Sequence, residues 1–142
     1  MTFFTVEQAE ELIPYLRAEL KRVRELREKL RMRLDTIPCA NATTPHGEEE
    51  LAQAIARDEK ALALVRAIED WFHQLRERGI ECKGVDQGLF DFPCLLEDRV
   101  VYLCWQEDED RIVAWHELDT GFAGRKPLLE AARLSRPSTV LH

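Results

Sequence analysis

Apolar side chains recur every three or four positions from residue 13 onward, which is the period of an amphipathic α-helix. Ahead of this stripe, Thr5 and Gln8 have the spacing of a capping box, so a first helix is predicted to begin near Val6. Pro14 then removes a backbone hydrogen-bond donor and crowds the preceding carbonyl. The pattern therefore predicts either a kink at Pro14 or a short helix followed by a long one.

Two long helices are predicted between residues 15 and 79, joined by a loop that is rich in turn formers. The first runs from Tyr15 to about Leu34. The second begins at the acidic run 48–50 and stops at Gly79, a favoured residue just past a helix end. Its apolar face is broader than one antiparallel helix can cover. We therefore expect the sheet, or a second copy of the chain, to cover the rest.

Residues 80–118 alternate between apolar and polar positions in short runs separated by acidic turns, which predicts three or four antiparallel strands in a meander. Glu97 and Asp98 are predicted to form a tight turn. In one register that illustrates the faces, Leu103 stands opposite Val113, and a one-residue slip would change these partners. Both faces remain largely apolar, so the helices are expected to cover one and the tail or a symmetry mate the other.

These elements define an α+β fold, in which a long kinked antiparallel helical hairpin packs on a small three- to four-stranded antiparallel sheet. At 142 residues the chain is most simply one domain, and it can bury a core without disulfides or metals. Within residues 1–142 we expect the hairpin at 5–79, the meander at 80–118, and a glycine-rich turn with a partly ordered tail at 119–142. A short helix is predicted in that tail, at 127–134.

The chain is acidic overall, with a formal net charge of −7 and a pI near 5.2, which argues against general binding to nucleic acid. Residues 17–33 are the exception, with eight basic and three acidic side chains. They are interpreted either as a patch for nucleic acid or anionic lipid or, preferably, as a helix face complementary to the acidic second helix. No apolar run is long enough to span a membrane and no signal-peptide pattern opens the chain, so a cytoplasmic protein with reduced thiols is expected.

The motifs LFDFP, VYLCW, VAWHELD and GFAGR follow KGVDQGL and two long helices. Together with the opening FTVEQAEELIPYLR, they resemble the bacterial domain-of-unknown-function 2203 family over nearly the whole chain. The resemblance implies no particular activity. The family's recurrent polar positions match Asp91, His116, Glu117, Asp119 and Arg125. Cys82 and Cys94 stand at positions where other members often carry different residues, which weakens a metal site that depends on them.

Three cysteines and one histidine could supply a tetrahedral zinc site from adjacent strands: Cys82, Cys94, Cys104 and His116. Their spacing of ten to twelve residues lacks the close ligand pairs of zinc ribbons. Small buried hydrophobic side chains are the favoured interpretation of the cysteines.

A second candidate site combines His116, Glu117, Asp119, Asp91 and Arg125 for metal or anion binding or for acid–base chemistry. Adjacent strand residues point to opposite faces, so His116 is expected to meet Asp91 or Asp119 rather than Glu117. The alternative is a hydrogen-bonded histidine at a strand end. Arg125 could grip a carboxylate or phosphate, or could tie the tail down by pairing with one of the three acids.

The preferred functional hypothesis is a non-catalytic protein that self-associates, as a dimer rather than a larger oligomer, through apolar surface left over by the hairpin and sheet. It depends on four aromatic side chains needing a partner: Trp71, Tyr102, Trp105 and Trp115. The alternative is a metal- or small-anion-binding protein, with or without enzymatic activity, that uses the second candidate site. The cofactor is unknown at this stage, a divalent metal is considered but not favoured, and any other protein partner is unknown.

Overall fold

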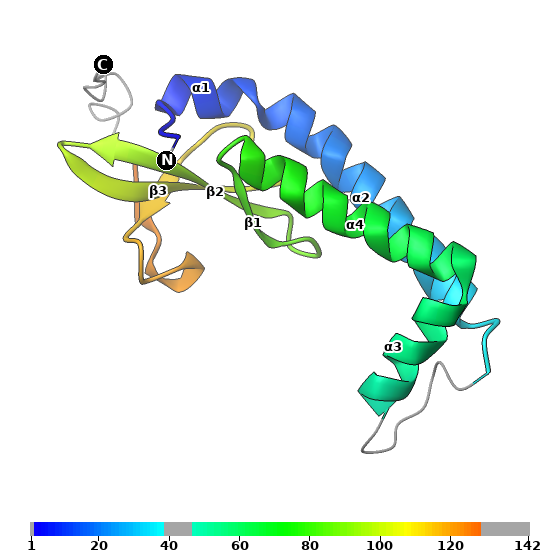
Figure 1. Cartoon of the computed structure of the whole chain (residues 1–142). Coiled ribbons are helices and arrows are strands. Elements are labelled where there is room, and N and C mark those ends of the chain that lie inside the picture. Colours follow the sequence, from blue (N-terminus) through cyan, green and yellow to red (C-terminus); the bar gives the residue numbers. More distant parts are fainter. Residues whose placement is uncertain (1, 39–46, 129–142) are drawn as a thin grey trace. The chain divides into compact units, whose positions relative to one another are not determined.

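Four helices make up the first half of the fold in the computed structural model, which describes residues 2–38 and 47–128. They are α1 (Val6–Glu11), α2 (Ile13–Leu34), α3 (Gly47–Arg57) and α4 (Glu59–Glu77), drawn from blue to green in Figure 1. None of these described helices combines the length and the apolar character that crossing a bilayer requires.

The first helix begins as predicted, at a capping box. The Gln8 amide nitrogen donates to the Thr5 hydroxyl oxygen at 3.0 Å, and the Thr5 nitrogen donates to the Gln8 side-chain oxygen at 2.9 Å. Helix α1 ends at Glu11, and Pro14 lies in the first turn of α2, where its missing donor is tolerated. The prediction of a short helix followed by a long one is therefore confirmed.

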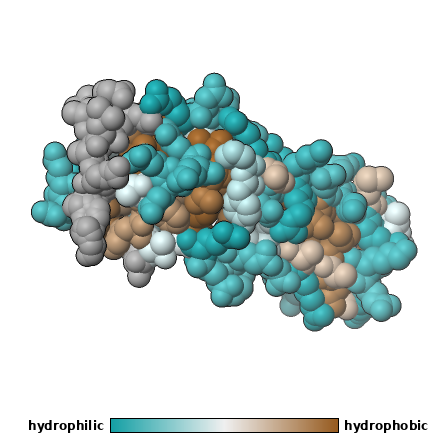
Figure 2. Space-filling view, turned by 90° about the horizontal axis from the view of Figure 1, so that it is seen from above, coloured by the Kyte–Doolittle hydropathy of each residue, from teal (hydrophilic) through white to brown (hydrophobic). Residues whose placement is uncertain are grey.

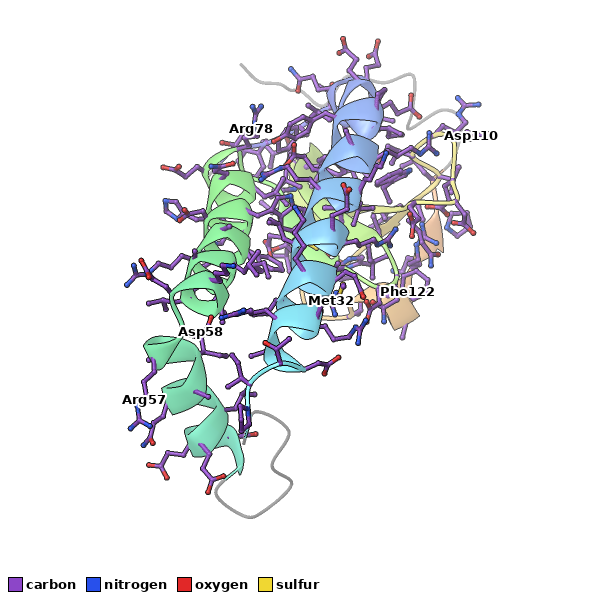
Figure 3. The ribbon with its side chains drawn as sticks, turned by 90° about the vertical axis from the view of Figure 1, so that its right-hand side faces the viewer. Met32, Arg57, Asp58, Arg78, Asp110 and Phe122 are labelled. Carbon is purple, nitrogen blue, oxygen red and sulfur yellow. The ribbon has the colours of Figure 1, made fainter. Side chains whose placement is uncertain are left out.

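The predicted second helix is wrong in one respect, because it breaks at Asp58 into α3 and α4 (Figure 3). The Asp58 carboxylate accepts a hydrogen bond from the Ala61 amide at 2.9 Å, which caps the start of α4. Arg33 of α2 binds both carboxylate oxygens, with nitrogen–oxygen distances of 3.0 and 2.7 Å. The apolar positions keep their helical spacing across Asp58, so the hydrophobic pattern alone does not predict that the helix ends there.

Five antiparallel strands follow in the order of the chain: β1 (Glu81–Gly84), β2 (Leu89–Leu96), β3 (Arg99–Gln106), β4 (Ala114–His116) and β5 (Lys126–Pro127). The α+β class and the antiparallel meander are confirmed, with one strand more than predicted. Strand β5 lies in the segment predicted to be a glycine-rich turn. The predicted helix at 127–134 falls outside the described residues from 129 onward.

Register is set differently on the two sides of β3. Glu97 and Asp98 have φ angles of 51° and 65°, as in a two-residue hairpin turn, and they pair Leu96 with Arg99. Between β3 and β4 the illustrated pairing is wrong, because Leu103 stands opposite Trp115 rather than Val113.

This two-residue shift has its cause in the loop between β3 and β4, which contacts both neighbouring residues and α1. The Ile112 amide donates to the Glu10 carboxylate at 2.9 Å, and the Trp105 ring nitrogen donates to the Glu109 carbonyl at 2.8 Å. These contacts hold residues 107–113 out of the pairing between β3 and β4. A shift of two residues leaves every side chain on its predicted face.

The chain divides into two compact units, residues 1–20 with 74–142 (unit 1) and residues 21–73 (unit 2). In unit 1, six apolar side chains on one face of the sheet are fully buried: Phe90, Phe92, Cys94, Val101, Leu103 and Trp105. The N-terminal segment covers it, because the Phe4 ring packs edge-on against Phe92 at 5.3 Å and the Phe4 amide donates to the Pro93 carbonyl at 2.8 Å. The opposite face carries the polar side chains described next.

Candidate functional site

Polar side chains gather on the second face of the sheet because the strand registers place them opposite one another. Asp91 of β2 pairs with Cys104 of β3, and Tyr102 of β3 pairs with His116 of β4. Glu81 of β1 pairs with Asp91 from the other side. We call these five residues the polar face; they come from four neighbouring strands of the sheet (Figure 1).

The centre of the polar face is a buried pair, Asp91 and His116, with 1% and 2% of their surfaces exposed. The His116 Nε2 atom lies 3.0 Å from Asp91 Oδ2, and its Nδ1 atom lies 2.7 Å from the Glu117 carbonyl oxygen. A carbonyl oxygen only accepts, so Nδ1 must carry a proton and donate it. Nε2 and Oδ2 then share one further proton, which fixes the ring orientation.

The Cys104 thiol completes the cluster and is fully buried. One donor atom from each of Asp91, Cys104 and His116 lies within 4.8 Å of the other two. Burial raises the pKa of Asp91, against the lowering effect of His116. Burial, reinforced by the charge of Asp91, raises the pKa of Cys104 to about 12. Without a cation the thiol is therefore protonated and a poor nucleophile.

The rim of the polar face is a second set of contacts. The Tyr102 hydroxyl donates to Glu81 at 2.5 Å, and the Lys83 ammonium donates to the other oxygen of that carboxylate at 2.8 Å. The hydrogen bond to Glu81, together with burial, raises the pKa of Tyr102 to about 12. The centroids of the Tyr102 and His116 rings lie 5.4 Å apart.

Of the five residues predicted as a site, the structure brings Asp91 and His116 together. Glu117 instead lies 3.4 Å from Arg99 and 3.3 Å from Lys126 through its carboxylate. Asp119 is exposed in the turn after β4. The expectation that His116 and Glu117 diverge agrees with this arrangement.

The expected partners of Arg125 are wrong. Its guanidinium donates to both carboxylate oxygens of Glu109, at 2.8 and 2.9 Å, and to the Cys104 carbonyl at 3.1 Å. The Glu109 carboxylate lies close to Arg125 because it also accepts a hydrogen bond from the Gln106 backbone nitrogen at 2.8 Å. That bond folds the acidic turn back toward β3. Arg125 therefore approaches the cluster through Cys104, not through an acid of the predicted site.

The zinc site of three cysteines and His116 is not assembled. Cys82 pairs with Phe90 and Cys94 with Val101, so both belong to the opposite face from Cys104. Burial raises the pKa of Cys94 to about 11. Within the described residues no cysteine forms a disulfide, and Cys39 lies outside them.

Sequence reasoning did not include Glu81 or Tyr102 in either candidate site, and it considered Cys104 only with the other cysteines, but the contact between Cys104 and Asp91 carried a usable signal. A two-residue turn at Glu97–Asp98 fixes which residues of β2 and β3 face each other, and it places Asp91 opposite Cys104. Combining the predicted turn with strand alternation would have found this contact.

Unit 2 carries a surface of a different kind. Ten apolar side chains of its two helical arms are only half buried, and we call them the hairpin stripe: Leu26, Leu30, Leu34, Leu51, Ile55, Leu62, Leu64, Val65, Ile68 and Phe72. Among its described residues only Val23, Ala61 and Trp71 are buried. Figure 2 shows apolar side chains, in brown, grouped over these helices between hydrophilic ones. Met32 is 57% exposed.

Fold and site together define an α+β protein whose antiparallel meander carries a buried Asp–Cys–His cluster and whose helical hairpin bears a half-buried apolar stripe. The chain belongs to the DUF2203 family, because the family model described as "Uncharacterized conserved protein (DUF2203)" matches residues 2–128. The resemblance found in the sequence motifs is thereby confirmed. Comparisons with curated proteins and with solved structures give no match.

Proposed function

We propose that the protein is a non-catalytic interaction module that pairs with a second copy of itself through the helical hairpin of unit 2. The hairpin stripe carries this proposal. Two helices can bury only the sides that face each other, and apolar side chains left at the surface favour a further helical layer. A second hairpin would complete a four-helix arrangement.

Charge supports a second copy as the occupant of this surface. Residues 21–33 of α2 hold seven basic and two acidic side chains, a net charge of +5. Residues 47–73 of α3 and α4 hold seven acidic and three basic side chains, a net charge of −4. A two-fold axis would set the basic helix of each copy against the acidic helices of the other, and such an interface is self-complementary.

The aromatic residues give less support than the hairpin stripe does. Trp71 and Trp105 are 1% and 0% exposed in one copy of the chain, so neither needs a partner. Tyr102 and Trp115 are half buried. The proposal therefore depends on the hairpin rather than on the sheet, and a location in the cytoplasm stays a prediction.

Sedimentation velocity or light scattering on the full chain at micromolar concentration tests the proposal. We expect a dimer for the wild type. Leu64→Glu should give a monomer with unchanged helical circular dichroism, because a carboxylate would enter the paired surface. Ala63→Glu adds the same charge at an exposed neighbour and should remain dimeric. A wild type that stays monomeric at all concentrations would overturn the proposal.

A second candidate function is the binding of a metal or small anion by the polar face. The observation that favours it is the convergence of Asp91, Cys104 and His116, although Glu117 and Asp119 lie apart from them. No catalytic activity is proposed for this site.

A further inference from the structure

We infer that Asp91, Cys104 and His116 form a site for one thiophilic divalent ion of the zinc class. The inference deepens the second candidate function and is independent of self-association. It adds Cys104 as a ligand, and it removes Glu117, Asp119 and Arg125 from the ligand set.

The positions of the donor atoms support a single ion. They come from three adjacent strands and lie within 4.8 Å of one another, with Nε2 of His116 and Oδ2 of Asp91 at 3.0 Å. Bonds of about 2.0–2.3 Å to a tetrahedral zinc ion separate neighbouring ligand atoms by roughly 3.3–3.8 Å. Small side-chain rotations would therefore bring all three atoms onto one ion.

The surroundings of the three side chains are those of metal ligands. His116 donates its Nδ1 proton to the Glu117 carbonyl, which leaves Nε2 directed at the cluster, the usual support of a ligating histidine. The Asp91 Oδ1 atom is buried, and it has no hydrogen-bonded partner within the described part of the chain. A buried carboxylate oxygen of this kind is suited to a cation.

Charge balance selects the kind of ion. On binding, the Cys104 thiol proton and the proton shared by His116 and Asp91 leave to solvent. One thiolate and one carboxylate then neutralise a divalent cation, which makes burial tolerable. Thiolate and imidazole favour zinc or cobalt over magnesium or calcium. The described residues supply three ligands, so a water molecule completes the tetrahedron.

The test is metal titration of the full chain after chelator treatment, followed by native mass spectrometry. We expect one zinc ion per chain and no retained magnesium or calcium. Cys104→Ser should lose the ion. Cys94→Ser is the matched control, since Cys94 is equally buried on the opposite face, and it should keep the ion. Equal binding by both variants would overturn the assignment to Cys104, while leaving the chain a metal-binding protein.

Cobalt substitution keeps the inference testable if Cys104→Ser fails to fold. Cobalt bound by the wild type through a thiolate gives a sulfur-to-metal charge-transfer absorption band and the visible bands of a tetrahedral ion. Cys94→Ser should show both. A wild type that takes up no stoichiometric zinc, or whose cobalt spectrum lacks the sulfur band, would refute the site. A dimer that binds no metal would leave self-association intact.

Discussion

Two aspartates show how surroundings decide the behaviour of one residue type. Hydrogen bonds from Arg33, aided by the Ala61 amide, lower the pKa of Asp58 to about 2. Burial raises the pKa of Asp91, although His116 opposes it. Asp58 has a fixed cation and a helix N-terminus, both of which favour its charged form. Asp91 lies buried in the strand ladder, where the loss of hydration disfavours its charged form more than the contact with His116 favours it.

The lowered pKa of Asp58 predicts acid sensitivity. Its folded value of about 2 lies below the ordinary 3.8, so Asp58 contributes stability above pH 3.8 that is lost as the pH falls toward 2. Asp58→Asn keeps a capping side chain but loses the charged partner of Arg33. We expect the mutant to be less stable than the wild type at pH 7 and the difference to shrink by pH 2–3. Urea unfolding at both pH values measures it, and a constant difference would contradict the role of the charge.

At the residue scale, the sequence narrowed the partner of His116 to Asp91 or Asp119, of which the structure has Asp91, but it did not predict the partner of Arg125. The first follows from strand alternation, which excluded Glu117. The pairing of Arg125 with Glu109 depends on the conformation of the acidic turn, in which contacts to Gln106 and Trp105 orient Glu109. No periodicity encodes that conformation.

At the element scale, local turn chemistry was a better guide than hydrophobic pattern. The turn at Glu97–Asp98 sets eight consecutive residue pairs between β2 and β3. The register of β4 depends on residues 107–113, which contact Glu10 and Arg17 about a hundred positions away in the chain. A contact of that range cannot be inferred from neighbouring residues. The signal for the helix break at Asp58 is local, since aspartate is a favoured N-cap, but the uninterrupted apolar spacing favoured one continuous helix.

The hairpin turn allows a stabilising substitution. Glu97 and Asp98 both adopt positive φ, where non-glycine side chains are strained. Glu97→Asn with Asp98→Gly supplies the pair that a type I′ turn prefers. We expect the double mutant to gain about 0.5–1 kcal/mol in the free energy of unfolding, measured by chemical denaturation. A lower unfolding midpoint would show that these side chains make contacts that outweigh the strain.

At the scale of the whole molecule, the two units differ in how completely they bury their apolar side chains. Unit 1 buries the large side chains of its apolar sheet face within one copy, Phe90, Phe92 and Trp105 among them. Unit 2 leaves the hairpin stripe half buried. Unit 1 also exposes Phe3, Val113, Leu118 and Phe122, so the excess of apolar surface that the sequence suggested is shared between the units. Unit 2 differs in having ten half-buried apolar positions along its helices. The sequence could not distribute the excess between the units, because burial depends on packing that periodicity does not specify.

Charge reversal on the two helical arms tests how the copies pair. Lys21 and Lys29 are exposed on the basic arm, and Glu69 and Asp70 are exposed on the acidic arm. Lys21→Glu with Lys29→Glu should weaken self-association, because the net charge of residues 21–33 falls from +5 to +1 and most of the attraction to the acidic arm is lost. Glu69→Lys with Asp70→Lys should weaken it in the same way. Mixing the two variants should restore dimers, because the unaltered basic arm of one variant, with a net charge of +5, then faces the unaltered acidic arm of the other, with a net charge of −4.

The mixing result separates charge pairing from a general loss of stability. A variant that merely unfolds would not be rescued by a second weakened variant, whereas complementary arms would recover their attraction. Sedimentation of each variant alone and of the equimolar mixture provides the comparison, and added salt should weaken the mixed dimer because exposed charges are screened. Failure to recover dimers on mixing, with both variants folded, would mean that the basic and acidic arms do not face each other and that any association uses another surface.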